Sequence, residues 1–176
     1  MKYTTTTNVS YSMLRDALLI DQQVFGDRSA EYRVCRYWLD KNSESFIILL
    51  DQQKNAVGYI CFLPLKESVY QDYLDGKIHE YALRSKDILR YENGKTYSCL
   101  YCCIIIDKDH HNKLATSTLV QGYKDLMQSL KDRNITISRI VADCVTDKGV
   151  QFALREGLRP IKSYDGGQIF EKVLLK

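Results

Sequence analysis

YSCLYCCIIID, residues 97 to 107, is the longest and most apolar strand-like run of the chain. A strand that is apolar at nearly every position is buried on both faces, so this run predicts a central strand with helices on each side of the sheet. FIILL (46–50) and AVGYICFLPL (56–65) precede it and are separated by the polar turn DQQKN, which predicts a hairpin. The fold class that follows is α/β, or α+β, with one mixed sheet.

The segment after the central strand predicts a crossover. A helix is expected after KDHHNK, because apolar side chains recur there on one helical face, at Leu119, Tyr123, Leu126, Met127 and Leu130. ISRIVADC (137–144) reads as the next strand. Strand, helix and strand then form a right-handed unit with parallel pairing.

The last forty residues predict one more helix and a strand pair. The helix is expected over 148–155 and ends at Gly157, which can supply the positive φ of a helix C-terminus. The strands are expected around 161–164 and 169–174, joined by a turn at Asp165-Gly166-Gly167.

The N-terminal third predicts a β-branched edge strand, KYTTTTNV (2–9), followed by a helix with Ser10 or Ser12 as its cap. A second helix is expected over 29–41, because its apolar side chains share one face.

A connection of about thirty residues, 66–96, separates the hairpin from the central strand and is far longer than the turn requires. It predicts a helix over 69–74, a break at Gly76 and a second helical pattern through Leu83, Ile88 and Leu89. A substrate lid and a decorative helical insertion are equally compatible with it.

Length and composition indicate a single domain, 1–176, with this helical insertion. The net charge is +3, and the 25 basic residues are scattered among 22 acidic ones, which argues against a nucleic-acid partner. The sequence shows neither a signal-peptide pattern nor a membrane-spanning run, so we expect a soluble, cytoplasmic protein that binds no membrane. The oligomeric state stays open, and a homodimer is compatible with the sequence.

The six cysteines are expected as reduced, buried thiols. Cys99 and Cys102 lie on one predicted strand, where side chains three apart point to opposite faces, so they do not form a zinc clamp. We expect no metal.

The order of these elements resembles the GNAT superfamily of N-acyltransferases over essentially the whole chain, and the resemblance implies that family's mostly antiparallel sheet flanked by helices on both faces. The most specific local match is TDKGVQFALREGLRPI (146–161) after ISRIVADC. Gly157-Leu158 stands where the family carries a glycine-aromatic pair. The resemblance implies acetyl-coenzyme A as co-substrate.

The family's coenzyme pyrophosphate is held by a Q/R-x-x-G-x-G/A turn at a helix N-terminus, where free N–H groups and the helix dipole favour an anion. Here the turn reads His111-Asn112-Lys113-Leu114-Ala115-Thr116, with His111 in the place of Gln or Arg and no glycine. Leu114 either points away and leaves the N–H groups available, which we favour, or fills the phosphate site and abolishes binding. The resemblance places coenzyme binding at Ile104, Ile106, His111, Asn112, Lys113, Leu114, Ala115, Thr116, Ser117 and Thr146.

The family's catalytic positions are not retained. Its general-acid tyrosine falls on Ala153 and its frequent asparagine on Thr146. By location the catalytic candidates are Tyr101, Asp143 and Cys144. Core packing is the alternative role for Tyr101 and Cys144, and a solvated strand-end carboxylate is the alternative for Asp143.

The acceptor side would be walled by the first two helices and by the 66–96 insertion. Its first half combines aromatic and acidic side chains that suit a cationic amine, or alternatively form a solvated helix face: Glu67, Tyr70, Asp72, Tyr73, Asp75 and Glu80. Two functions therefore stay open. One is an acyl-coenzyme A-dependent N-acyltransferase acting on a primary amine of a small molecule or peptide by direct transfer, and the other is a non-catalytic binding or regulatory protein that has lost coenzyme binding.

Overall fold

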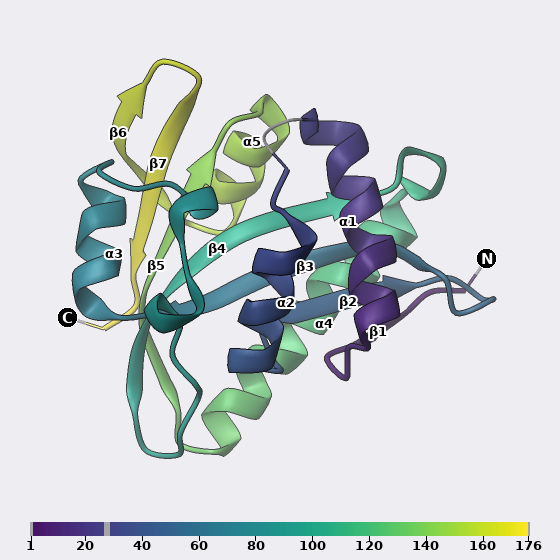
Figure 1. Cartoon of the computed structure of the whole chain (residues 1–176), viewed down its shortest axis with the longest axis horizontal. Helices are drawn as coiled ribbons and strands as arrows, with labels where there is room; N and C mark the ends of the chain where they lie inside the picture. Colours follow the sequence, from purple (N-terminus) through teal and green to yellow (C-terminus); the bar gives the residue numbers. More distant parts are fainter. Residues whose placement is uncertain (1, 27–28, 176) are drawn as a thin grey trace.

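The protein forms one seven-stranded sheet covered by helices on both faces, in a computed structural model that describes residues 2–26 and 29–175 (Figure 1). The strand order is β1-β2-β3-β4-β5-β7-β6. The strands are β1 (Thr4–Thr6), β2 (Phe46–Leu50), β3 (Ala56–Leu65), β4 (Thr96–Ile106), β5 (Thr136–Cys144), β6 (Arg159–Tyr164) and β7 (Gly167–Val173). The helices are α1 (Tyr11–Phe25), α2 (Tyr32–Lys41), α3 (Glu67–Leu74), α4 (Lys113–Asp132) and α5 (Asp147–Arg155).

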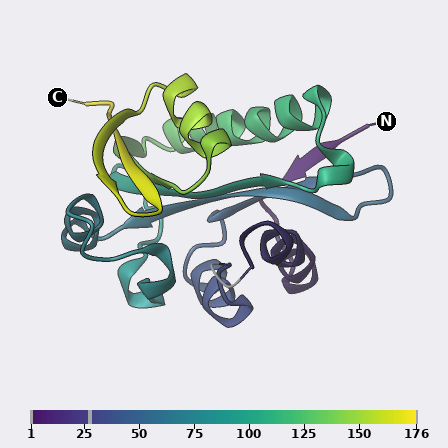
Figure 2. The ribbon, with the colours of Figure 1, turned by 90° about the horizontal axis from the view of Figure 1, so that it is seen from above.

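The sheet separates two helical layers (Figure 2). Helices α1, α2 and α3 cover one face, and α4 and α5 cover the other. All strand pairs are antiparallel except β4 and β5, which are joined through α4 and run parallel. The predicted mixed, mostly antiparallel sheet with helices on both faces is therefore confirmed, as is the crossover.

Strand β4 occupies the centre of the sheet, as its apolar sequence predicts. Its side chains contribute to both hydrophobic cores. Cys99 packs toward α4 and Cys102 toward α1, so these two thiols do lie on opposite faces. The alternation breaks at the next residue, because the register with β3 shifts between the pairs Cys61–Cys103 and Phe62–Tyr101. This bulge turns Cys102 and Cys103 toward the same face.

Several predicted boundaries shift. The first strand spans only three residues, and Ser10, whose Oγ accepts from the N–H of Met13 at 3.2 Å, caps α1. The second helix begins at Tyr32 and not at Ser29. The final turn is Asp165-Gly166, and Gly167 is already the first residue of β7.

The second half of the insertion differs from the prediction, because no α-helix forms over Leu83 to Leu89. Two short 3₁₀ helices, Glu80–Ala82 and Ser85–Asp87, stand there instead. Leu83 and Ile88 are buried, and Ile88 forms an isolated bridge with Leu65 at the end of β3. The apolar residues that suggested helical periodicity are thus anchors of a loop that packs on the sheet.

Close packing of α4 on the sheet edge depends on Gly122. A Cβ at this position would lie 2.6 Å from Oγ1 and 2.8 Å from Cβ of Thr5 on β1. Such distances force a shift of the strand or of the helix, since Thr5 is stiff at χ1.

We expect Gly122→Ala to lower the free energy of unfolding by up to about 2 kcal/mol, because an overpacking cost of about 1–3 kcal/mol outweighs the gain in helix propensity of about 1 kcal/mol. Chemical denaturation measures this. Ser129→Ala, at an exposed position of the same helix, is the control and should cost nothing. Equal or higher stability of Gly122→Ala would show that β1 does not rest on α4 this closely.

Candidate functional site

The candidate site is the point at which β4 and β5 separate. Their parallel pairing ends at Tyr101–Ala142, although β4 continues to Ile106 and β5 to Cys144. Beyond this pair β5 stays bonded to β7, and β4 stays bonded to β3. One edge of β4 over residues 102–106 therefore has no strand partner in the described part of the chain, and Ile104 and Ile106 lie on it.

Two helices begin beside this divergence, on the same face of the sheet. Helix α4 follows the end of β4 and α5 follows the end of β5 (Figure 2). Asn112 caps α4, with its Oδ1 accepting from the N–H of Ala115 at 2.9 Å, and Thr146 caps α5, with its Oγ1 accepting from the N–H of Gly149 at 3.1 Å. Both positive dipole ends thus point toward the C-terminal ends of β4 and β5.

The glycine-free turn forms an ordinary helix start. Leu114 is 50% exposed, Ala115 is fully buried, and the hydroxyls of Thr116 and Ser117 donate back to the backbone oxygens of Asn112 and Leu114. Leu114 does not enter the core, so its side chain leaves the first N–H groups of the helix uncovered from within the protein. His111 and Lys113 are exposed on the same turn.

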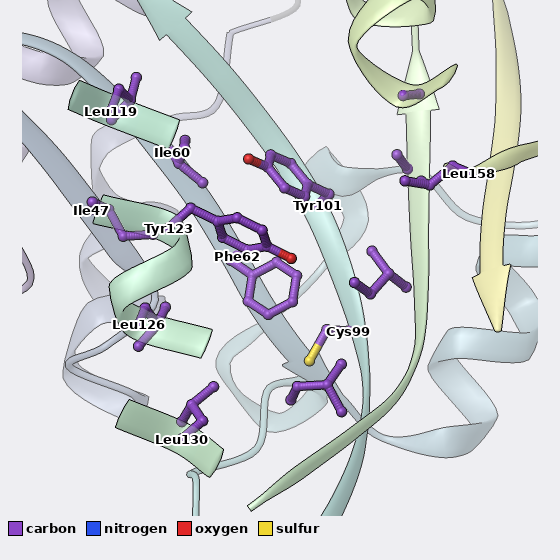
Figure 3. Close-up of a cluster of buried hydrophobic side chains, with 14 of the residues drawn as sticks. Ile47, Ile60, Phe62, Cys99, Tyr101, Leu119, Tyr123, Leu126, Leu130 and Leu158 are labelled. Carbon is purple, nitrogen blue, oxygen red and sulfur yellow. The ribbon is translucent and has the colours of Figure 1, made fainter. Parts of the chain in front are cut away.

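Tyr101 is the last residue of β4 that pairs with β5, and its ring is held in the core on the α4 side (Figure 3). Its ring centroid lies 5.1 Å from that of Tyr123 and 5.3 Å from that of Phe152. The hydroxyl has no hydrogen-bond partner within the described residues, and burial raises the pKa of Tyr101 well above its ordinary value. A phenol with a raised pKa is a poor proton donor, which leaves packing as its evident role.

Cys144 is buried near the end of β5. Burial raises the pKa of its thiol to about 11, so the thiol stays protonated near neutral pH. Because the thiolate is the reactive form of cysteine, Cys144 is poorly suited to act as a nucleophile or base.

Asp143 is neither solvated nor alone. Only 4% of its side chain is exposed, and its two carboxyl oxygens share the single hydroxyl proton of Tyr164, at oxygen–oxygen distances of 2.7 and 2.6 Å. The Nδ1 atom of His79 lies 3.3 Å from its Oδ2. Asp143 therefore ties together β5, the end of β6 and the insertion. The small Gly167 permits this arrangement, since a Cβ there would collide with the Tyr164 ring.

Glu80, which the sequence placed only in a general acidic patch, is a further candidate residue. Burial, followed by the negative charges of Asp143 and Asp21, raises the pKa of its carboxyl to about 8, and the Tyr73 hydroxyl donates to it at 3.4 Å. Glu80 also interacts electrostatically with Cys102 and Cys103 on the bulge of β4. It thus lies on the side of the sheet opposite to α4 and α5 and is partly exposed.

Asp21 joins the same group from α1. Its carboxyl is buried and accepts from the Tyr59 hydroxyl at 2.7 Å and from the Cys103 thiol at 3.5 Å. Burial raises its pKa. Asp21, Glu80 and Asp143 therefore bring three carboxyl groups to one side of the sheet.

The rest of the expected acidic patch pairs within the protein. Glu67 forms a salt bridge with Arg139 at 2.6 Å, and Lys77 lies 2.7 Å from Asp75. Tyr70 and Tyr73 are fully buried, so neither ring face is open to a ligand. Of the residues in this patch, Glu80 is the one that lies on the same side of the sheet as Asp21 and Asp143.

The surface hollows of the protein lie away from the candidate site. Two surface hollows, of about 660 and 440 Å³, are lined by the β1–α1 and α2–β2 connections and by the C-terminal half of α4 with the start of β5, and neither reaches the divergence of β4 and β5. Among the described residues, no group of histidine, cysteine and acidic side chains has the arrangement of a metal site. No helix of that same part is long and apolar enough to span a membrane.

Comparison with known proteins supports the fold. No protein-family model and no curated protein sequence matches the chain. Solved structures do match it. Ard1 from Thermoplasma volcanium is 11% identical with a TM-score of 0.63, and each chain is covered completely. A GNAT-family acetyltransferase from Staphylococcus aureus Mu50 is 14% identical with a TM-score of 0.59, over 98% of this chain and 99% of that one.

The same fold also occurs in the C-terminal condensation domain of Ebony, solved with beta-alanyl-dopamine, which is 8% identical with a TM-score of 0.60 over 99% of this chain and 100% of that one. The chain therefore has the GNAT fold, which the sequence resemblance predicted. Sequence identities this low support a shared architecture only, so the chemistry has to be argued from the residues of the site itself.

The raised pKa of Glu80 predicts a pH-dependent loss of stability. Between its ordinary pKa of 4.5 and the folded value of about 8, the folded state keeps a proton that the unfolded state has released, so stability falls as pH rises through this window. The glutamine of Glu80→Gln cannot ionise. We therefore expect the melting temperature of this variant, relative to that of the wild type, to increase from pH 5 to pH 9.

Glu67→Gln is the matched control with the opposite sign. Hydrogen bonds from Gln71 and Arg139 lower the pKa of Glu67, so its ionised form stabilises the fold above that pKa, and the amide should cost stability at neutral pH. A parallel response of the two variants to pH would refute the raised pKa of Glu80.

Proposed function

We propose that the protein is an acyl-coenzyme A-dependent N-acyltransferase that transfers an acyl group, acetyl in the simplest case, directly to a primary amine of a small molecule or peptide. The observation that carries this proposal is the unpaired edge of β4, with two helix N-termini on one side of the sheet and three carboxyl groups on the other. An acyl donor and an amine can then meet between the separated strands.

The donor side suits an extended, amide-bearing ligand that ends in phosphates. Unpaired N–H and C=O groups along residues 102–106 can bond the amides of a pantetheine arm as a neighbouring strand would. The first N–H groups of α4 have no partner in the helix, and Asn112 caps only that of Ala115, which leaves those of Lys113 and Leu114 for a pyrophosphate. Lys113 and His111 add charge beside it.

The acceptor side suits an ammonium group. The overall reaction requires a base, because the ammonium must lose a proton before its nitrogen can attack the thioester. Glu80, with a pKa of about 8, can take that proton in its ionised form, whose share rises as the pH approaches 8. No metal is needed for this chemistry.

The state of the thiols favours direct transfer of the acyl group over a route through an acyl-cysteine intermediate. Cys102 and Cys103 lie on the bulge next to the divergence, and their surroundings raise the pKa of both. For Cys102 the largest cause is the hydrogen bond with Cys61, and for Cys103 it is burial. Both stay protonated, so neither supplies the thiolate that a covalent route needs.

A second function is favoured by two observations. The turn over 111–116 lacks the glycines through which phosphates approach a helix end closely, and neither surface hollow reaches the divergence. A non-catalytic binding or regulatory protein would show both. Coenzyme binding separates the two functions.

Acetyl-coenzyme A at millimolar concentration should raise the melting temperature, because a ligand that binds only the folded state stabilises it by about 2.7 kcal/mol at one hundred times its Kd. Thermal denaturation measures this. ATP at the same concentration supplies phosphates without a pantetheine arm and should produce a smaller shift. If acetyl-coenzyme A produces no shift, the transferase proposal fails and the non-catalytic function replaces it.

Lys113→Glu should weaken acetyl-coenzyme A binding by roughly three- to tenfold, since an exposed favourable charge becomes a repulsive one. Titration calorimetry measures the Kd, and the effect should shrink at high salt. Lys124→Glu, an equal charge change at an exposed position further along α4, is the control and should leave the Kd unchanged. Equal Kd values for both variants would place the phosphates away from the start of α4.

A further inference from the structure

His79, Asp143 and Tyr164 come from three separate segments and meet on the acceptor side of the site. The Tyr164 hydroxyl donates its one proton between the two carboxyl oxygens of Asp143, and the centroid of the Tyr164 ring lies 5.4 Å from that of His79. His79 also stacks on Tyr81, with ring centroids 5.6 Å apart and an interplanar angle of 22°. The imidazole is thus fixed on two sides, while 31% of its side chain stays exposed.

The contact with Asp143 determines which nitrogen of His79 carries the proton. A carboxylate only accepts, so a hydrogen bond between the Nδ1 atom of His79 and Oδ2 of Asp143, 3.3 Å apart, requires Nδ1 to be the donor. In the neutral ring, Nε2 is then free to accept a proton. A base oriented in this way by a buried carboxylate is the arrangement that proton-transfer histidines require.

We propose that His79 is a proton-transfer residue on the acceptor side that passes to solvent a proton released by the amine, with Asp143 and Tyr164 as positioning residues. The inference rests on the proposed acyltransferase function. In that reaction the ammonium nitrogen loses two protons when it forms an amide. One proton ends on the sulfur of coenzyme A, and the other is released to water.

Glu80, the next residue in the chain after His79, is partly exposed. Its side chain accepts a hydrogen bond from Tyr73, and the titratable groups that face it within the described residues are acids or thiols: Asp21 from α1, Cys35 from α2, Cys61 from β3, Cys102 and Cys103 from β4, and Asp143 from β5. His79 is partly exposed as well. Imidazole is the side chain that exchanges protons readily near neutral pH.

Exchange of His79 for glutamine tests the relay. Thiol release from acetyl-coenzyme A is measured with a panel of simple primary amines: ethanolamine, putrescine and tyramine. With whichever amine the wild type acetylates, His79→Gln should lower kcat by about 10²-fold and leave the KM of the amine and the Kd of acetyl-coenzyme A unchanged. Tyr81→Phe keeps the stacked ring and is the control, with wild-type kcat expected.

Chemical rescue distinguishes a proton carrier from a packing residue. The rate of His79→Ala should rise with added imidazole and with buffer concentration, whereas the wild-type rate should not. Asp143→Asn should lower kcat in the same direction, because the amide no longer selects the Nδ1–H form. Nitrogen-15 NMR of the histidines should show that form in the wild type and a mixture of tautomers in Asp143→Asn.

The outcomes distinguish a failure of the proton relay from a failure of the proposed acyltransferase function. Amine acetylation that survives His79→Gln with unchanged kcat overturns the relay alone. An Nε2–H ring in the wild type does the same, and so does a His79→Ala rate that imidazole fails to raise. A wild type that releases no thiol with any of these amines and shows no melting-temperature shift with acetyl-coenzyme A overturns the proposed function, and the relay with it.

Discussion

The end of β4–β5 pairing at Tyr101–Ala142 is the constraint on which the rest of the site depends. Two parallel strands that stayed paired to their ends would seal the sheet, and the two helical layers would be isolated from each other. The separation is stabilised from outside, since β3 holds the far edge of β4 and β7 holds the far edge of β5. The unpaired backbone of β4 is therefore a property of the topology and does not require local strain.

The two faces of the divergence have opposite electrostatic character. On the side of α4 and α5, helix N-termini present partial positive charge, and on the side of α1 and the insertion Asp21, Glu80 and Asp143 present carboxyl groups. In the proposed function, an anionic donor would approach one face and a cationic acceptor the other, and the bulge at Cys102 lies between them. Burial, followed by the negative charges of Asp143 and Asp21, raises the pKa of Glu80 to about 8, so this carboxyl is mostly protonated at neutral pH.

The fold is predicted well from the sequence because the patterns that indicate each helix and strand are local. The apolar run over 97–107, the helical face of α4 and the glycine that ends α5 each report on a few neighbouring residues, and those elements form as expected. The site is less predictable, because residues 79, 143 and 164 meet only through long-range packing. The bulge is equally invisible, since Cys102 and Cys103 fit an alternating pattern until the register with β3 is known. Leu83 and Ile88 misled the helix prediction because anchors of a loop can recur at helical spacing by chance.

In the proposed function, the glycine-free start of α4 changes how the coenzyme would be held more than whether it could be held. A backbone N–H is supplied by every residue except proline, and Asn112 forms the same cap that a conventional helix start would have. The side chains at positions 113 and 114 keep phosphates further from the helix end than glycines would. The interaction between the phosphates and the helix dipole is then weaker, because it falls off within the first turn. A larger share of the affinity must then come from the edge of β4, where binding depends on backbone groups and not on side-chain identity. The divergence of the strands is for this reason a better guide to function in this chain than the loop sequence.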